Sequence, residues 1–300
     1  MQPAESDHRI ILSVFAVIGA MLSLGVGASL AKTLFEAVGP LGTAAYRIVV
    51  GAAILIAIFR PWRWHTTRDQ WRQIAPYGLT LGLMNLFFYQ ALSTLPVGVA
   101  IAIEFTGPLL LATLTSRQPI DFLWVALALA GLLLLSPLNQ LNEYLDPVGV
   151  FCALAAGACW AAYIVLGRRA SRLPAGQVTS LGMLLAAALA VPVGVTQAGL
   201  SLLDPSLLIM GLLVGLLSSA IPYSLEMFAL KHLQTKTFGV VLSIEPAFGA
   251  LAAAIVLGEL LQVVQLGAIL CIMAASAGCT LTAVRQGYRD KKQTIGDKHE

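Results

Sequence analysis

Apolar runs long enough to cross a lipid bilayer, which takes about 20 residues, recur along the whole chain. Hydrophobic residues make up 58% of the 300 residues and charged residues 11%, whereas a typical soluble domain is about 25% charged. Runs of this length favour helices over the shorter, alternating strands of a membrane β-barrel. The sequence therefore predicts an all-α integral membrane protein.

Ten segments have the length and apolar character of membrane spans, and only short loops separate them. They are residues 10–31, 41–59, 74–93, 97–116, 121–138, 148–167, 178–196, 208–230, 238–258 and 263–284. We interpret the first segment as a helix rather than a signal peptide, because it has no clear small-x-small cleavage site.

The Lys and Arg residues predict the orientation of these spans. With the N-terminus in the cytoplasm, 16 of the 18 basic residues fall in cytoplasmic segments, Lys32 lies outside and Arg47 lies within a span. The opposite orientation would reverse this count. One missed span would place the basic residues that follow it on the other side of the membrane. We therefore predict that both termini are cytoplasmic and that residues 285–300 form a basic cytoplasmic tail.

Ten spans divide into two halves of five, and an odd number in each half means that the halves enter the membrane from opposite sides. Residues 91–108 resemble residues 229–246 at an offset of 138, which pairs Pro108 with Pro246. Weak internal similarity of this kind is typical of inverted repeats in secondary transporters. The prediction is two inverted five-helix repeats, over residues 1–146 and 147–284.

Four ionisable side chains lie deep inside predicted spans: Arg47, Glu104, Glu226 and Glu245. A charged group at this depth costs about 2.5–3.5 kcal/mol by insertion scales, and it faces a cavity or a partner rather than lipid. A static ion pair that fixes helix packing is the structural alternative. Since three acids and one base cannot all pair, we interpret the cluster as a binding site.

Two of these acids stand beside predicted helix breaks. Pro108, which follows Gly107, crowds the carbonyl group four residues earlier, and that carbonyl belongs to Glu104. Pro246 directly follows Glu245 and disfavours helical backbone there. Irregular backbone at membrane depth is tolerated only where protein or cavity water satisfies it. Breaks in both halves therefore point to a transporter binding site.

The third acid has a similar setting. Pro222 frees the carbonyl group of Ser218 and stands four residues before Glu226. Tyr223 and Glu226 are three residues apart, so they share one face of a helix. We therefore include Pro222 and Tyr223 in the predicted site.

The predicted cluster suits the exchange of a proton for an amino acid. A carboxyl group in a low-dielectric site favours its neutral form, so it can take up a proton and release it on the other side. It can instead pair with the ammonium of an amino acid, and competition between the two gives antiport. Two roles remain open for Arg47: it binds a substrate carboxylate, or it pairs with one of the glutamates. Secondary candidates for the cavity wall are Asn85, Tyr89, Trp160 and Tyr163.

Other classes of protein lack support. The sequence has no HExxH, GxSxG or P-loop motif, so we predict neither an enzyme nor a bound metal or cofactor. The net charge of +3 comes without a continuous basic face, which argues against nucleic acid as a partner. The cysteines fit small buried apolar residues, since none belongs to a CxxC pair: Cys152, Cys159, Cys271 and Cys279.

Segments from about Gly27 to Thr282 resemble the EamA type of the drug/metabolite transporter superfamily. The resemblance is carried together by residues 27–39, 103–109, 116–125, 157–164, 221–230 and 236–247. It implies a bacterial inner-membrane protein that exports small amino acids of the threonine and homoserine type, driven by the proton-motive force. It also implies a substrate cavity between the repeats, with small amino acids, protons and the lipid bilayer as partners.

The sequence leaves alternatives open. An exporter of another metabolite, such as an aromatic amino acid or a drug-like cation, would have the same organisation. A passive channel or a membrane scaffold would belong to a different class. The sequence predicts no oligomeric state.

Overall fold

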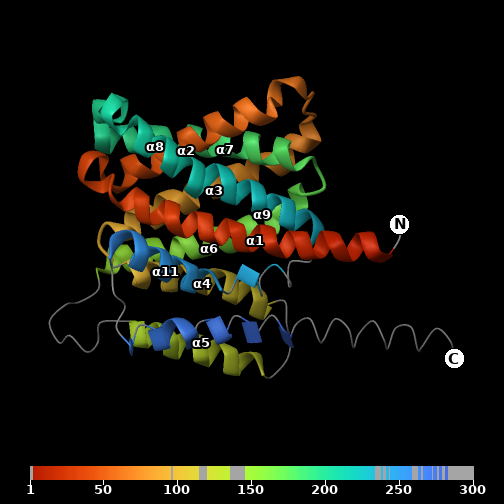
Figure 1. Ribbon diagram of the computed structural model, residues 1–300, viewed down its shortest axis with the longest axis vertical. Helices are drawn as coiled ribbons and strands as arrows, with labels where there is room; N and C mark the ends of the chain where they lie inside the picture. Colours follow the sequence, from red (N-terminus) through yellow and green to blue (C-terminus); the bar gives the residue numbers. More distant parts are fainter. Residues whose placement is uncertain are drawn as a thin grey trace.

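A computed structural model of the chain is all-helical in the part that it describes (Figure 1), which confirms the predicted class. The described residues are 3–95, 97–114, 120–135, 146–233, 238, 241–242, 244–258, 263–264, 266–271, 273–275, 277–278 and 281–282. The predicted tail, residues 285–300, and Cys279 lie outside them.

The first half of the chain contributes five helices: α1 (Pro3–Lys32), α2 (Phe35–Phe59), α3 (Arg68–Leu92), α4 (Val97–Leu114) and α5 (Asp121–Leu135), with the 3-10 turn η1 (Pro61–Arg63) between α2 and α3. The second half contributes α6 (Pro147–Ala170), α7 (Ala175–Ala198), η2 (Gly199–Leu203), η3 (Pro205–Leu207), α8 (Leu208–Gly215), the π-helical turn η4 (Leu216–Ala220), α9 (Ile221–His232) and α11 (Glu245–Leu257).

Five helical segments in the described part of the chain are long and apolar enough to cross a membrane. They are Ile11–Lys32, Phe35–Phe59, Pro147–Ala170, Ala175–Leu203 and Pro205–His232. Large apolar side chains cover the outer faces of the helices, and Phe15 is 65% exposed. Apolar surface on this scale suits contact with lipid rather than with water. The chain is therefore a multi-pass membrane protein.

Local sequence signals explain where several helices begin. Thr67 and Gln70 form a reciprocal capping box at the start of α3. Asp146 caps α6, with Pro147 in the first helical position. A hydrogen bond from the Thr94 side chain, followed by bonds from two backbone amides at the start of α6, lowers the pKa of Asp146. These caps satisfy amide groups that have no partner inside the helix.

Helix α2 begins earlier than the predicted start at residue 41. The described helix starts at Phe35 and kinks at Gly39, the residue before Pro40. The φ angle of Gly39 is 70°, a left-handed backbone conformation that favours glycine. The Gln197 side chain of α7 accepts hydrogen bonds from the amides of Leu41, at 2.7 Å, and Gly42, at 3.2 Å. The kink thus lies where the sequence predicted the start of the span, and another helix supplies the missing cap.

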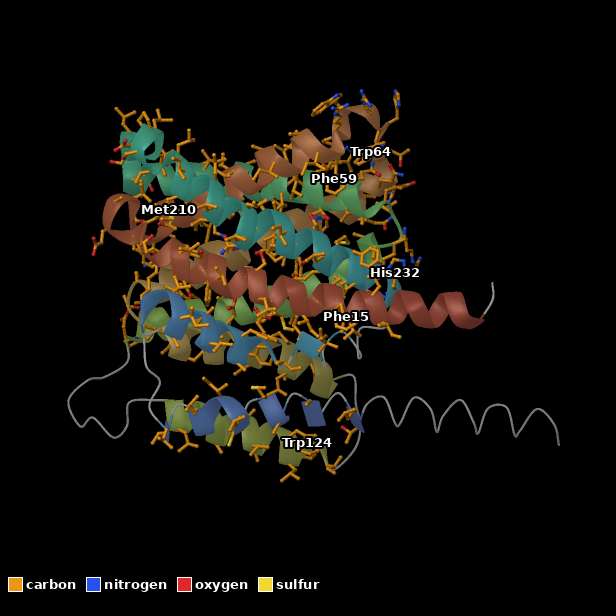
Figure 2. The ribbon with its side chains drawn as sticks, viewed as in Figure 1. Phe15, Phe59, Trp64, Trp124, Met210 and His232 are labelled. Atoms are coloured by element: carbon orange, nitrogen blue, oxygen red, sulfur yellow. The ribbon has the colours of Figure 1, made fainter. Side chains whose placement is uncertain are left out.

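Helices of the first half pack largely against helices of the second half. Helix α2 packs on α7, α3 on α6 and α7, α4 on α6, and α1 on α9 and α11. Figure 1 shows α2, α7 and α8 on one side of the molecule and α4 and α5 on the other, with α1 and α6 between them. In Figure 2, Phe59, Trp64 and His232 lie at one end of the helices and Met210 lies at the opposite end. The middle of the molecule is therefore an interface between helices of the two halves of the chain.

Helices α4 and α6 cross at two glycines. A Cβ atom added to Gly107 would lie 1.9 Å from the carbonyl oxygen of Gly157. A Cβ atom added to Gly157 would lie 2.4 Å from the carbonyl oxygen of Glu104, the group that Pro108 deprives of its helical partner. Small residues allow this close approach of two backbones in a membrane. The crossing brings the Glu104 backbone directly against α6.

This crossing predicts that Gly107→Ala destabilises the protein. Because the new methyl group would collide with backbone atoms of α6, the helices must separate, and overpacking of this kind costs about 1–3 kcal/mol. Thermal unfolding of the purified protein in detergent measures the loss. Gly267→Ala is the matched control, since nothing lies within 4 Å of a Cβ added there. Equal unfolding temperatures for the two variants would contradict the close crossing.

Candidate functional site

A cavity of about 100 Å³ lies between helices of both halves of the chain. Its wall includes residues of α1, α2, α3, α4, α6, α9 and α11. Eight of the side chains predicted from the sequence for binding line it: Arg47, Asn85, Glu104, Trp160, Tyr163, Tyr223, Glu226 and Glu245. Tyr89, which was also predicted for the cavity wall, is not one of the lining residues but accepts a hydrogen bond from Arg47. Residues separated by up to 198 positions in the chain are thus brought to one space.

Arg47 is 3% exposed and lies at the centre of a hydrogen-bond network. Its Nε donates to Ser219 Oγ at 3.1 Å, and its Nη1 donates to the Tyr89 hydroxyl at 2.8 Å. Its Nη2 donates to the Ser218 carbonyl oxygen at 2.6 Å and to the Tyr223 hydroxyl at 3.3 Å. A guanidinium group has five N–H donors. Four of the five therefore already have partners within the protein.

The acceptor at Ser218 explains how the irregular backbone beside Pro222 is satisfied. The π-helical turn η4 ends just before this proline, and Arg47 donates to the carbonyl group that the proline leaves free. One residue earlier, the Leu217 carbonyl accepts a hydrogen bond from Ser23 Oγ of α1 at 2.6 Å. Side chains of α1 and α2 thus satisfy a helix irregularity that lies in the second half.

One of the two roles that the sequence left open for Arg47, an ion pair with a glutamate, is not formed among the described residues. Among the residues described, no carboxylate oxygen lies within 4.0 Å of its guanidinium nitrogens. The partners are hydroxyl and carbonyl oxygens instead. Sequence reasoning identified the freed carbonyl at Ser218 but not its donor, because that donor comes from a helix 171 residues away.

Two of the three acids differ in how they are held. The Tyr163 hydroxyl donates to Glu226 Oε2 at 2.8 Å, and Glu226 is 6% exposed. The ring of Tyr163 also contacts the ring of Tyr223, with centroids 6.1 Å apart, which connects the surroundings of Glu226 to the Arg47 network. By contrast, Glu245 Oε2 is buried and has no hydrogen-bond partner among the described residues. An unsatisfied buried acceptor is costly, so this oxygen suits a ligand or a proton.

The predicted helix breaks lie next to the cavity, and they take different forms. Helix α4 continues through Gly107 and Pro108, so the proline removes a hydrogen bond without interrupting the helix. Pro222 is the second residue of α9, which directly follows η4, and Pro246 is the second residue of α11. The side chain of Pro246 lies outside the described residues.

Sequence reasoning missed a face of α1 that forms one side of the cavity. Gly25, Ala28, Ser29 and Lys32 line it, and their spacing of three and four residues puts them on one helical face. The sequence analysis assigned no role to the small residues, and it placed Lys32 outside the cytoplasm as a single basic residue. Their shared spacing was the signal that could have identified this face.

The fold and the cavity define a class: a multi-pass, all-helical membrane protein with an ionisable cavity between its two halves. The EamA-like transporter family model matches residues 11–137 and 147–281. The chain therefore belongs to the EamA-like transporter family. This family is one of transporters, which confirms that the chain is a transporter and not an enzyme.

Relatives match along nearly the whole chain. Threonine/homoserine exporter RhtA of Salmonella typhimurium (strain LT2) is 48% identical over 275 residues, covering 92% of this chain and 93% of that protein. Threonine/homoserine exporter RhtA of Escherichia coli (strain K12) is 47% identical over 284 residues, covering 95% and 96%. The uncharacterized transporter YwfM of Bacillus subtilis is 26% identical over 262 residues, covering 84% and 88%.

A solved crystal structure also resembles this fold. It superposes with a TM-score of 0.70 at 21% sequence identity and covers 91% of this chain and 98% of that chain. At this level of identity the likeness shows a shared fold alone.

The Arg47 network predicts that Arg47→Lys destabilises the protein. A lysine ammonium has three donors at one point and cannot reach the separate acceptors that the planar guanidinium spans. Each buried group left unsatisfied costs about 1–3 kcal/mol. Thermal unfolding in detergent measures this loss, with Arg169→Lys on the exposed end of α6 as the control. If both variants unfold at the wild-type temperature, the network does not stabilise the fold.

Proposed function

We propose that this protein is a secondary active transporter that exports small amino acids of the threonine and homoserine type across the bacterial inner membrane in exchange for protons. The observation that carries the proposal is the cavity, in which three carboxyl groups and two basic side chains face one space. Relatives at 47–48% identity are named threonine/homoserine exporters, which supports the substrate class.

The chemistry of the cavity fits a zwitterion. The acids Glu104, Glu226 and Glu245 offer acceptors for an ammonium group, and apolar residues such as Met21 and Trp160 complete the wall. A carboxyl group can hold either a proton or an ammonium ion, so protonation from one side expels the amino acid. The protein then couples the two movements without any further component.

We propose ten spans in two inverted repeats, over residues 1–146 and 147–284, with both termini in the cytoplasm. Support comes from the basic residues, 16 of 18 of which fall in the cytoplasmic segments of this topology. The packing of first-half helices against second-half helices supports two units that share one interface and can move relative to each other.

The ends of the cavity support alternating access. Lys32 and Leu92, the last residues of α1 and α3, line one end of it, which is periplasmic in the proposed topology. Toward the other end, Arg168 of α6 donates to the Leu230 carbonyl oxygen and, at 2.8 Å, to the Leu233 carbonyl oxygen, which joins α6 to the end of α9. The proposed cycle breaks this contact to expose the acids to the cytoplasm.

Reconstitution distinguishes this proposal from the alternatives. In vesicles loaded at a pH one unit below the outside, threonine should accumulate inside, because outward proton flow drives its entry. Exchange for one proton gives about tenfold accumulation. Downhill threonine movement alone would indicate a channel, and no threonine movement would indicate another metabolite as substrate.

Neutralising the acids should reduce transport without preventing insertion. We expect Glu104→Gln, Glu226→Gln and Glu245→Gln each to lower the initial threonine exchange rate about 10- to 100-fold, the effect of losing one charge-assisted hydrogen bond. The membrane content of each variant, measured by immunoblot, provides the reference. Asp69→Asn is the control, because Asp69 is exposed and pairs with Arg72 at 3.0 Å. Normal exchange by all three variants would refute a role for these carboxyl groups.

A further inference from the structure

The three acids of the cavity have different surroundings. Glu104 is close enough to Arg47 for the two charges to attract each other. Glu226 accepts a hydrogen bond from the Tyr163 hydroxyl at 2.8 Å. Glu245 has a buried oxygen, Oε2, that has no hydrogen-bond partner among the described residues. Glu245 is therefore the acid whose negative charge the surrounding protein stabilises least.

The charges around Glu245 also oppose its ionisation. Its carboxyl group interacts electrostatically with two other acids, Glu226 of α9 and Glu104 of α4. Two bases line the same cavity, Arg47 of α2 and Lys32 of α1, the helix on which α11 packs. Three acids and two bases leave at least one acid without a countercharge. Like charges close together disfavour ionisation, and Glu245 adds an oxygen without a donor to this disadvantage.

The ionised form of Glu245 is nevertheless accessible when a cation enters the cavity. Glu245 is the first residue of α11, a helix of 13 residues. The positive end of a helix dipole stabilises a nearby negative charge, but by less than the burial of an unpaired charge costs. A ligand ammonium group in the cavity would supply the missing countercharge. The protonated and the ionised form of Glu245 can therefore alternate with the absence and presence of a ligand.

We propose that Glu245 is the carboxyl group which exchanges its proton for the ammonium group of the amino acid. The inference rests on the proposed proton antiport and assigns the exchange to one of the three acids. When the amino acid enters from the cytoplasm, the O–H bond of Glu245 breaks, the proton leaves to cytoplasmic water, and the carboxylate pairs with the ammonium. On the periplasmic side a proton returns to the carboxylate and the amino acid leaves.

Chemical labelling of the full-length wild-type protein in detergent tests this assignment. The hydrophobic reagent dicyclohexylcarbodiimide reacts with protonated carboxyl groups, and peptide mass spectrometry locates the product. At neutral pH we expect Glu245 to be labelled at least about tenfold more than Glu104 or Glu226, which corresponds to about 1.4 kcal/mol in the free energy of protonation. Asp69, which is exposed, is the control and should remain unlabelled.

Two matched ligands show whether the labelled group meets the ammonium. Threonine and 3-hydroxybutyrate share a carboxylate and a hydroxyl group, but only threonine has an ammonium group. Threonine at ten times its Kd should lower the labelling of Glu245 about tenfold, because the ammonium replaces the proton in the occupied protein. At the same concentration, 3-hydroxybutyrate should leave the labelling near its value without ligand.

Proton release gives an independent measurement. In weakly buffered detergent solution, we expect the wild-type protein to release about one proton for each threonine that binds. Glu245→Gln should release almost none per threonine bound, Glu245→Asp should restore the release, and Glu104→Gln should keep it. A purely structural effect of the glutamine would weaken binding without changing the number of protons released per bound threonine.

The outcomes separate this inference from the proposed function. Preferential labelling of Glu104 or Glu226, or no labelling of Glu245, overturns the assignment, and so does full proton release by Glu245→Gln. If the wild-type protein binds threonine and releases no proton, the proposed antiport fails together with the assignment. If it does not bind threonine, the proposed substrate class fails, and labelling without ligand still decides which acid holds the proton.

Discussion

The buried guanidinium of Arg47 is the group around which the centre of the molecule is arranged. A charge in the membrane interior is tolerated only when polar partners replace its hydration. Here the partners are two tyrosine hydroxyls, a serine hydroxyl and a backbone carbonyl, contributed by α3, η4 and α9. Because these partners come from both halves of the chain, the network determines how the halves meet beside the cavity.

The same network explains why irregular backbone and acidic residues occur together. The π-helical turn before Pro222 exposes a carbonyl group that Arg47 needs, and Tyr223 extends the network to Asn85. With Arg47 engaged in this way, the acids keep separate environments. Glu226 is held by Tyr163, whereas Glu245 presents a buried oxygen without a partner in the described part of the chain. One polar cluster therefore contains both a rigid part and a part open to a ligand.

Much of this could be predicted from the sequence, and the failures have physical reasons. Glu104, Glu226 and Glu245 were identifiable because an acid in an apolar span has few roles other than a functional one. Lys32 was missed because its charge at a helix end is ordinary in sequence, and only the packing of α1 turns it toward the cavity. The interruption expected at Pro108 did not occur, because α4 tolerates one lost hydrogen bond where Gly157 of α6 covers the affected carbonyl.

The sequence by itself determined the helical class, the membrane environment and four ionisable residues of the cavity, Arg47, Glu104, Glu226 and Glu245, because each rests on the cost of placing polar groups in hydrocarbon. Tertiary structure alone decided which of those polar groups satisfy one another. Arg47 and Ser218 are 171 residues apart, and no local pattern specifies such a pair. Their contact depends on the angle and depth at which packed helices cross, and that packing determines which donors remain for a ligand.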